Sequence, residues 1–436
     1  MWRNWAGDQH CTPAAFVAPA TTAEIVAAIG HAAAERRRVR VAGAGHSFGD
    51  LVPTNGHLMS LRRMAAVLDA DRASGLVRVQ AGITIHALNR RLAELGLALE
   101  NVGDIEVQSI AGAIATATHG TGGRLRNISS QVSAAQLVAA DGEVTEVDGS
   151  DADLLRAVRV NLGALGVVSE LTLRCVPAFT LEGVDAPAPL EEALDRLDEL
   201  VDSNDHFELF TFPHSDLALT RTNNRTDAPP APPSAARSWV DDILLGNHLF
   251  GLACAAGRVA PRAIPTINRA VSHAVGTRRR VDRSHAIFAS PRRVRFTEME
   301  YAVPRAHAAA AVRAVRAAIG ERGFAVSFPI EVRFVAPDDA LLSPAAGRET
   351  CYIAVHMYRG MAWQPYFRCV EEIMDGFGGR PHWGKRHFQT AETLRERYPD
   401  WDRFAAIRAR LDPEGRFANP YVDRVLGRPA TAPSPR

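Results

Sequence analysis

The chain has 436 residues, more than one ordinary hydrophobic core serves, so two domains are expected. Its 47% hydrophobic and 23% charged residues are typical of a soluble globular protein, and a net charge of +1 provides no overall field for nucleic acid or an anionic membrane. The five cysteines form no C-x-x-C pair, which argues against a zinc site, a redox dithiol or a disulfide framework, and we expect no metal site.

Helix and strand signals alternate along the first 178 residues. Residues 21–37 begin with Thr21 and Glu24 in capping-box spacing and keep their apolar residues on one face, which predicts a helix. Next, "RVRVAG" predicts a strand, "VLDADRASGLVRVQAG" a hairpin, and "TIHALNRRLAELG" a helix capped by Thr84. A second hairpin is predicted at "LVAADGEVTEV", around its Asp-Gly turn, followed by a strand at "VVSELTLRCV". Residues 1–178 should therefore form a mixed α/β unit.

A different pattern follows "PAFTLEGVDAPAPLEEALDRL". Strand-like runs, "VRFTEMEYAV", "FPIEVRFV" and "CYIAVHMY", alternate with helix-like runs, which predicts an antiparallel sheet covered by helices. The proline-rich "TDAPPAPPSAARS" and the basic "GTRRRVDRSH" are expected to be exposed or mobile. No stretch reaches the roughly 20 clean apolar residues of a membrane span, and the N-terminus lacks a signal-peptide core. We therefore expect a cytoplasmic protein with no integral membrane segment and no nucleic-acid partner.

The stretch "GAGHSF" resembles the start of a dinucleotide-binding fingerprint, but Phe48 stands where the third glycine should be. No amphipathic helix follows it, although a loop of successive N–H groups can bind an anion without one. The small-residue stretch "SIAGAIATATHGTGG" leaves its backbone bare, which suits either a flat ring lying against it or a strand packed under a helix.

Two of the strand-like runs carry polar residues on one face. Alternation places Glu331 and Arg333 together in "FPIEVRFV", and it places Tyr352 and His356 together in "CYIAVHMY". A solvated ion pair is the ordinary explanation of the first. Two neighbouring strands that both carry such groups favour the lining of a cavity.

Lysine occurs once in the sequence. Of the 50 basic residues only Lys385 is a lysine, and it lies in "GRPHWGKRHF". Because arginine serves as the general cation of this chain, a single lysine indicates a position where a compact ammonium is required.

Together, "GAGHSF", "ATATHGTG", "LGALGVVSELTL", "EVR" and "RPHWGK" resemble the vanillyl-alcohol-oxidase superfamily of flavoproteins, and within it the sugar-1,4-lactone and alditol oxidases. The resemblance extends over nearly the whole chain, to "RFANPYVDRVLG". It implies an α+β fold with four parts: an FAD-binding domain over 1–178, a substrate domain over 179–385, a C-terminal segment over 386–428 that returns to the FAD domain, and a flexible tail over 429–436.

The resemblance also implies how FAD is held. In covalently flavinylated members the histidine of this loop, here His46, is bonded to the 8α-methyl of the isoalloxazine. No cysteine lies near "NVGDIEVQS", so a second covalent bond is not expected. The residues expected to contact FAD are Ala42, Gly43, Ala44, Gly45, His46, Ser47, Ser109, Gly112, Thr116, Thr118, His119, Gly120 and Val168.

At the flavin face the resemblance implies Glu331, Arg333, His356 and Lys385 as catalytic residues. Glu331 and Arg333 are expected to hold substrate hydroxyls, and Lys385 to favour the developing alkoxide or the anionic reduced flavin. Asp104 is expected to bind substrate, because it stands where the alditol oxidases carry a serine. Gly103 is expected to gate O2, and the alternative is a turn glycine that requires positive φ.

The predicted reaction is oxidation of a sugar 1,4-lactone such as L-gulono-1,4-lactone, by hydride transfer from a carbinol carbon to flavin N5, giving an ascorbate-type product. O2 or another acceptor reoxidises the flavin. An alditol oxidase is the alternative within the class, and a non-catalytic flavin-binding protein is the alternative outside it. A nicotinamide-dependent dehydrogenase is disfavoured, because no complete G-x-G-x-x-G followed by a helix occurs.

Overall fold

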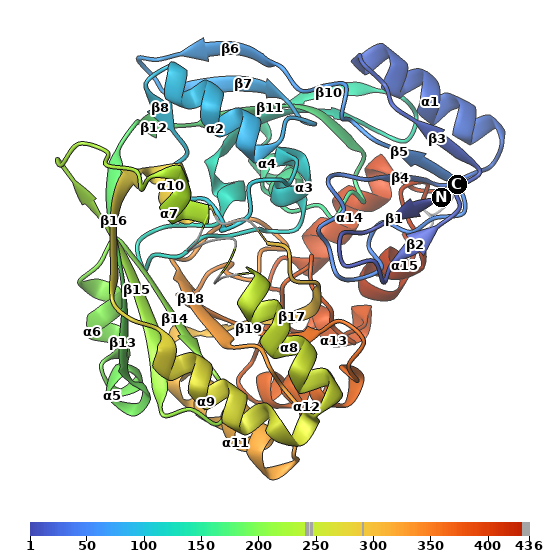
Figure 1. The fold of residues 1–436 in the computed structure, drawn as a ribbon. Helices are drawn as coiled ribbons and strands as arrows, with labels where there is room; N and C mark the ends of the chain where they lie inside the picture. Colours follow the sequence, from blue (N-terminus) through green and yellow to red (C-terminus); the bar gives the residue numbers. More distant parts are fainter. Residues whose placement is uncertain (240–243, 245–246, 290–291, 430–436) are drawn as a thin grey trace.

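The N-terminal region is built around two small sheets in the computed structural model of the protein, which describes residues 1–239, 244, 247–289 and 292–429 (Figure 1). The predicted first helix is confirmed as α1 (Thr22–Ala34), whose N-cap Thr21 accepts a hydrogen bond from the Glu24 N–H. Beside it, β3 (Ala15–Val17), β5 (His57–Met59) and β4 (Val39–Val41) form a parallel sheet in that order.

Both predicted hairpins are confirmed, and they share one antiparallel sheet of order β10-β9-β11-β7-β6. The predicted helix after the first hairpin is α2 (Ile85–Glu94), capped by Thr84. The five strands are β6 (Val67–Asp71), β7 (Leu76–Gln80), β9 (Val132–Val138), β10 (Val144–Val147) and β11 (Val167–Arg174).

The second region is an eight-stranded antiparallel sheet of order β16-β13-β15-β14-β18-β19-β17-β20. Its strands are β13 (Thr180–Pro189), β14 (His206–Thr211), β15 (Leu217–Thr226), β16 (Arg278–Arg283), β17 (Phe296–Pro304), β18 (Ile330–Val335), β19 (Thr350–Tyr358) and β20 (Arg380–Pro381).

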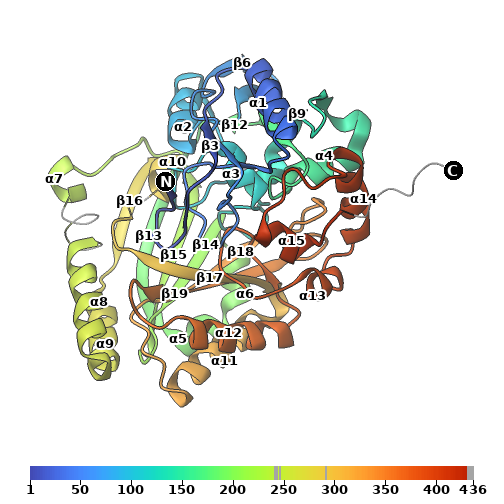
Figure 2. The same cartoon turned by 90° about the vertical axis from the view of Figure 1, so that its right-hand side faces the viewer.

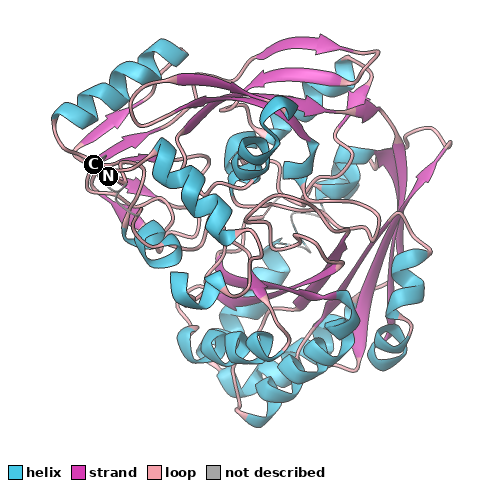
Figure 3. Ribbon diagram, turned by 180° about the vertical axis from the view of Figure 1, so that it is seen from behind, coloured by secondary structure: helices cyan, strands magenta, loops and turns pink. Residues whose placement is uncertain are grey.

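Helices cover the outer face of this sheet, as seen from behind in Figure 3. These helices are α5 (Leu190–Asp195), α6 (Leu197–Asp202), α11 (Ala308–Glu321) and α12 (Gln364–Gly376). Apolar side chains of these helices and of alternate strand positions form the second hydrophobic core. The predicted α+β architecture, with an antiparallel sheet covered by helices, is confirmed.

The C-terminal segment returns to the first region. It contributes α13 (Ala391–Arg395), α14 (Trp401–Leu411) and α15 (Pro420–Leu426), drawn in red in Figure 1. Phe404, Phe417 and Tyr421 pack in the first core together with Trp383 and Leu341, two residues that lie within the range predicted for the substrate domain.

Two stretches differ from the sequence-based expectation. The basic stretch contains β16, an edge strand paired with β13, because a row of backbone hydrogen bonds holds it in the sheet despite its arginines. The small-residue stretch forms a short helix, α3 (Ile110–Ala115), instead of a strand, since Ser109 caps it and its alanines favour a helix.

The remaining elements are short. Helices α8 (Phe250–Val259) and α9 (Ile264–Ala274) lie along one side of the molecule (Figure 2). The others are β1 (Trp2–Arg3), β2 (His10–Cys11), β8 (Leu97–Ala98), β12 (Val176–Pro177), α4 (Ala152–Arg159), α7 (Ala235–Ser238) and α10 (Ser284–Phe288).

Among the helices of the described residues, none has the length and apolar character needed to cross a bilayer. The predicted flexible tail falls almost wholly outside the described residues, which end at 429.

Candidate active site

One long cavity lies between the two domains, and it is lined by the motif residues of both. The first domain contributes the loop 42–48, the N-terminal end of α3 and the loop around Gly103. The second contributes side chains from β17, β18 and β19 and from the loop that contains Lys385. The cavity is therefore where the separate sequence motifs meet.

The loop 42–47 fits a pyrophosphate. Within the described part of the chain, the backbone N–H groups of residues 43–47 donate no hydrogen bond to protein. Successive N–H groups left open along a cavity wall form an anion-binding concavity. The loop is fixed at its end, where the Phe48 N–H donates to Gly384 O at 2.8 Å, which ties "GAGHSF" to "RPHWGK".

The loop also packs closely on α3. A Cβ on Gly43 would lie 2.6 Å from Ser109 Oγ and 3.8 Å from Gly112 Cα. Ser109 Oγ in turn accepts the Gly112 N–H at 3.3 Å, as an N-cap does. This contact explains the two glycines: each allows one backbone to approach the other along the cavity wall.

His46 is held by an aromatic neighbour. Its ring stacks on Trp5 at a centroid distance of 5.3 Å, and Trp5 also receives Arg295 on its face. Burial, together with Lys385 and Arg295, lowers the pKa of His46 to about 4. The imidazole is therefore neutral at pH 7 and keeps a nitrogen lone pair available for bonding.

The polar groups of the second domain stand on one face of four adjacent strands. In the register of β14, β18, β19 and β17, Glu208 is opposite Arg333, and Glu298 is opposite His356. Ala354 stands between Glu331 and Glu300, so a small side chain separates the two carboxyl groups. Alternation directs the intervening residues into the second core. The solvated ion pair considered for Glu331 and Arg333 is therefore wrong, because both side chains are buried.

Arg333 lies among three carboxylates. Its Nε donates to Glu208 at 2.8 Å, and its Nη2 contacts Glu331 and lies 3.3 Å from Asp104. Burial alone would raise the pKa of Asp104, but Arg333 and Arg292 outweigh burial and hold it well below its usual value. Burial raises the pKa of Glu331, and Arg333 only partly offsets that effect.

Lys385 is partly buried, with its ammonium near two carboxylates of β17. Nζ lies 2.6 Å from Glu298 Oε1 and 4.0 Å from Glu300 Oε2, and it stands over the Phe48 ring at 5.1 Å. Burial would lower the pKa of Lys385, but Glu298 and Glu300 more than compensate and raise it. The single lysine of the chain is thus a fixed positive charge at the cavity wall.

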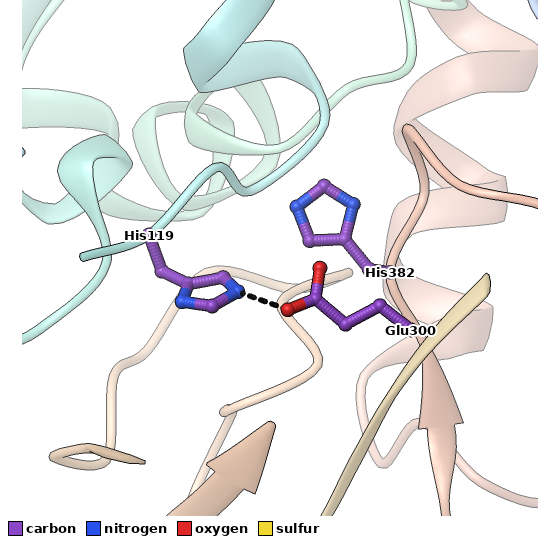
Figure 4. Close-up of side chains that lie close together, drawn as sticks. All are labelled: His119, Glu300 and His382. Carbon is purple, nitrogen blue, oxygen red and sulfur yellow. Dashed lines mark hydrogen bonds and ion pairs between the residues drawn. The ribbon is translucent and has the colours of Figure 1, made fainter. Parts of the chain in front are cut away.

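Figure 4 shows His119, Glu300 and His382, whose side-chain ligand atoms lie within 4.8 Å of one another. His119 Nδ1 donates to Gly120 O at 2.8 Å, and its Nε2 lies 3.2 Å from Glu300 Oε1. His382 Nδ1 accepts the Gly384 N–H at 3.0 Å, which leaves the proton on Nε2. Neither nitrogen of His382 then has a lone pair for a metal, so this cluster fits a hydrogen-bonded network better than a cation site.

Of the residues predicted from the sequence, all but one line the cavity: Ala42, Gly43, Ala44, Gly45, His46, Ser47, Gly103, Asp104, Ser109, Gly112, Thr116, Thr118, His119, Val168, Glu331, Arg333, His356 and Lys385. Gly120 does not line it. A Cβ at that position would lie 2.1 Å from Asn101 Oδ1, so the glycine is required for packing behind the wall.

The sequence reasoning missed four charged residues of this region: Glu208, Arg292, Glu298 and Glu300. The signal for two of them was present. "TEMEY" places Glu298 and Glu300 on one face of a strand by the same alternation that identified Glu331 and Arg333. Arg292 lies outside any regular element, and no local pattern marks it.

Comparison with known proteins agrees with this geometry. The family model of an FAD binding domain matches residues 13–148, and the model of D-arabinono-1,4-lactone oxidase matches residues 171–425. A cholesterol oxidase from B. sterolicum has the same fold, with a TM-score of 0.83 over 98% of this chain and 96% of that one, at 16% identity. The fold and the cavity thus define an FAD-dependent oxidoreductase of the vanillyl-alcohol-oxidase type.

Full-length relatives narrow this class. An L-gulono-1,4-lactone dehydrogenase of Mycobacterium tuberculosis is 50% identical over 98% of this chain and 99% of its own length. The L-gulonolactone oxidase of Mus musculus is 34% identical over 98% of both chains. An alditol oxidase of Streptomyces sp. is 32% identical over 97% of this chain and 98% of its own. The chain belongs to the D-arabinono-1,4-lactone oxidase family, which confirms the resemblance identified from its motifs.

Proposed function

We propose that the protein oxidises L-gulono-1,4-lactone or a similar aldonolactone at a carbinol carbon and gives an ascorbate-type product. One observation carries the proposal: the cavity of an FAD binding domain, with Asp104 in its wall, is lined on its other side by Glu331, Arg333, His356 and Lys385 of the second domain. The relatives named for lactone substrates, whose matches cover 98% of the chain, support the same substrate class.

The charged residues have separate tasks in this proposal. Arg333 is held through Nε and Nη2, and its Nη1 makes no hydrogen bond within the described residues, which leaves a donor for a substrate hydroxyl. Glu331 and Asp104 provide acceptors for the hydroxyl groups of a sugar ring. Lys385 stabilises negative charge that develops on the reacting oxygen.

FAD is the cofactor, and when bound it accepts the two electrons and the hydrogen that leave the carbinol carbon. The residues that would hold it are the open N–H groups of the loop 43–47 and the N-terminal end of α3. His46 would attach it covalently. The neutral state of His46 and its stacking on Trp5 support that role.

Anaerobic mixing tests the substrate class. L-Gulono-1,4-lactone and related lactones should bleach the flavin absorbance near its oxidised maximum, and open-chain alditols should do so more slowly. Because air is absent, the result does not depend on the final electron acceptor. Faster bleaching by an alditol would replace the lactone proposal with the alditol oxidase alternative. An absence of bleaching by the whole panel would favour a non-catalytic flavin-binding protein.

Acid precipitation tests the covalent attachment. The flavin of the wild type should remain with the precipitated polypeptide, whereas His46→Ala should release it into the supernatant. His31→Ala is the matched control, because His31 is an exposed histidine of the same domain and should leave the flavin attached. Release of flavin from the wild type would show that His46 makes no covalent bond.

A further inference from the structure

Two carboxylates on one face of β17 line the cavity, and each contacts a different set of charged side chains. Glu298 Oε1 lies 2.6 Å from Lys385 Nζ and 3.5 Å from His356 Nε2. Glu300 lies farther from the lysine, at 4.0 Å, and pairs with His119 (Figure 4). A single oxygen of Glu298 therefore stands between an ammonium and an imidazole.

The tautomer of His356 follows from its other contact. His356 Nδ1 lies 3.2 Å from the carbonyl oxygen of Pro329, which can only accept, so Nδ1 carries the proton. In the neutral ring the lone pair is then on Nε2. The 3.5 Å to Glu298 is longer than an ordinary N–H···O hydrogen bond, and a proton on Nε2 would turn this contact into one.

The other neighbours of His356 leave Glu298 as the carboxylate that affects the protonation of its ring. Phe296 and Phe328 pack against His356 at centroid distances of 5.1 Å and 5.7 Å and supply no charge. Glu331, on β18, is paired with Arg333. Among the described residues, Glu298 is the charged side chain that forms an ion pair with His356, and Lys385 stands behind it.

Three acidic groups of the cavity, Glu298, Glu300 and Asp104, are poor acceptors for a substrate proton. Burial would raise the pKa of Glu298, but Lys385 and His356 outweigh it and lower it. The pKa of Glu300 is lowered as well, since His119 and Lys385 outweigh its burial. Asp104 is held ionised by Arg333 and Arg292. His356, in contrast, faces the Glu298 carboxylate through Nε2 and gains a favourable charge partner by taking up a proton there.

We propose that Glu298 is a positioning residue, whose Oε1 fixes the Lys385 ammonium and makes His356 Nε2 the acceptor of the hydroxyl proton of the substrate. The inference rests on the proposed function. As the carbinol is oxidised, the C–H bond breaks and its electron pair leaves with the hydrogen to FAD. The O–H bond breaks, its proton moves to Nε2, and the electron pair left on oxygen forms the C=O bond. The resulting imidazolium then faces the Glu298 carboxylate.

The test compares Glu298→Gln with Glu300→Gln, an isosteric change two residues away on the same face of β17. The first readout needs no substrate: a pH titration of ¹⁵N-histidine-labelled holoprotein, with the His356 signal assigned by its loss in His356→Gln. Removing an adjacent carboxylate should move the His356 midpoint down by about 1 to 3 pH units in Glu298→Gln. The same midpoint should stay in place in Glu300→Gln, because the Glu298–His356 pair is intact there.

The second readout is the pH profile of anaerobic flavin reduction by the lactone. His356→Gln should lose about 100-fold or more in the limiting reduction rate, the usual contribution of a general base, and it should lose the acidic limb of the profile. Glu298→Gln should shift that limb to lower pH, because the imidazolium has lost its partner. Glu300→Gln should keep the limb where it is.

An unmoved His356 midpoint in Glu298→Gln, equal shifts in the two glutamine variants, or an acidic limb that persists in His356→Gln would each overturn the inference. If no lactone or alditol reduces the wild type, the proposed function fails. In that case the titration still decides whether Glu298 governs the protonation of His356.

Discussion

Replacing Lys385 by arginine keeps the positive charge and changes the shape of the group that carries it. The ammonium is compact and fits between Glu298 Oε1 at 2.6 Å and the face of Phe48. A guanidinium carries the same charge on a wider planar fork, which this space does not accommodate without moving its neighbours. The residue therefore tests whether a point charge at this position is required.

Lys385→Arg should slow anaerobic flavin reduction by a factor of roughly 100 to 1,000, the typical effect of losing one preorganised charge. Stopped-flow absorbance with the lactone measures it. Arg386→Lys is the reciprocal exchange at the next residue, whose side chain pairs with Asp8 at 2.6 Å outside the cavity, and it should reduce close to the wild-type rate. Near-normal reduction in Lys385→Arg would mean that the single lysine is a coincidence of composition.

Among single residues, the sequence predicted positions well where a residue pattern corresponds to a regular geometry, such as the alternation of side chains along a strand. Alternation along a strand placed Glu331, Arg333 and His356 correctly on faces that line the cavity. The charge partners of these residues were not predictable in the same way. Glu208 and Arg292 reach Arg333 and Asp104 only through the pairing of β14 with β18 and the course of an irregular loop, and both are long-range features.

The loop between β8 and α3 brings Gly103 and Asp104 to the cavity wall. Gly103 does not have positive φ, so the alternative that it is a turn glycine in the left-handed region is wrong. A Cβ added there would lie 3.2 Å from His119 O and 3.5 Å from the Thr118 methyl, so alanine requires the His119 carbonyl to move by a few tenths of an ångström. The proposed role of Gly103 as an oxygen gate can therefore be tested without breaking the loop.

Gly103→Ala should keep its melting temperature and its anaerobic reduction by substrate. Its reoxidation by O2 should slow by more than about tenfold, which corresponds to about 1.4 kcal/mol of barrier. Stopped-flow mixing of the reduced enzyme with air-saturated buffer measures the rate. A wild type that reduces with substrate but barely reoxidises in air would contradict the gate and indicate a dehydrogenase with another acceptor.

Among the elements, those with a strong local signal were predicted best. The helix caps at Thr21 and Thr84 and the two hairpins form as their side chains and turn residues require. The strand alternative for the stretch 109–123 was wrong over 110–115, because small residues carry little periodicity and a single cap at Ser109 decided the helix. The edge strand β16 forms because β13 offers it a partner, which a run of arginines does not reveal.

For the molecule as a whole, the C-terminal segment is held against the first domain by buried polar side chains. Arg40 is buried and donates to carbonyl oxygens of Leu51, Leu162, Gly163 and Phe417. Burial, reinforced by Arg408, lowers its pKa to about 10, so it remains charged at pH 7. One side chain thus ties the FAD-binding loop region to a segment nearly 380 residues later, and Asn419 repeats the link through Pro53 O at 3.0 Å.

Phe417 tests whether this return of the chain stabilises the cofactor site. Its side chain is 1% exposed in the first core, and its carbonyl accepts from Arg40 at 2.6 Å. Removing a buried phenyl ring costs about 3 to 5 kcal/mol, so Phe417→Ala should lower the free energy of unfolding by that amount. Because the same core holds α3, whose N-terminal end lines the cavity, flavin should dissociate at a lower temperature or denaturant concentration in a background where His46 is also replaced.

Chemical unfolding followed by tryptophan and flavin fluorescence measures both effects. Phe16→Ala is the matched control, since it removes the same side chain from the same domain at a position that is 50% exposed, where substitutions usually change stability by less than about 0.5 kcal/mol. Equal stability of the two variants would mean that the C-terminal segment rests on the first domain without supporting it. Loss of stability with unchanged flavin retention would mean that FAD binding does not depend on this core, and it would leave the loop 43–47 as the part that holds FAD.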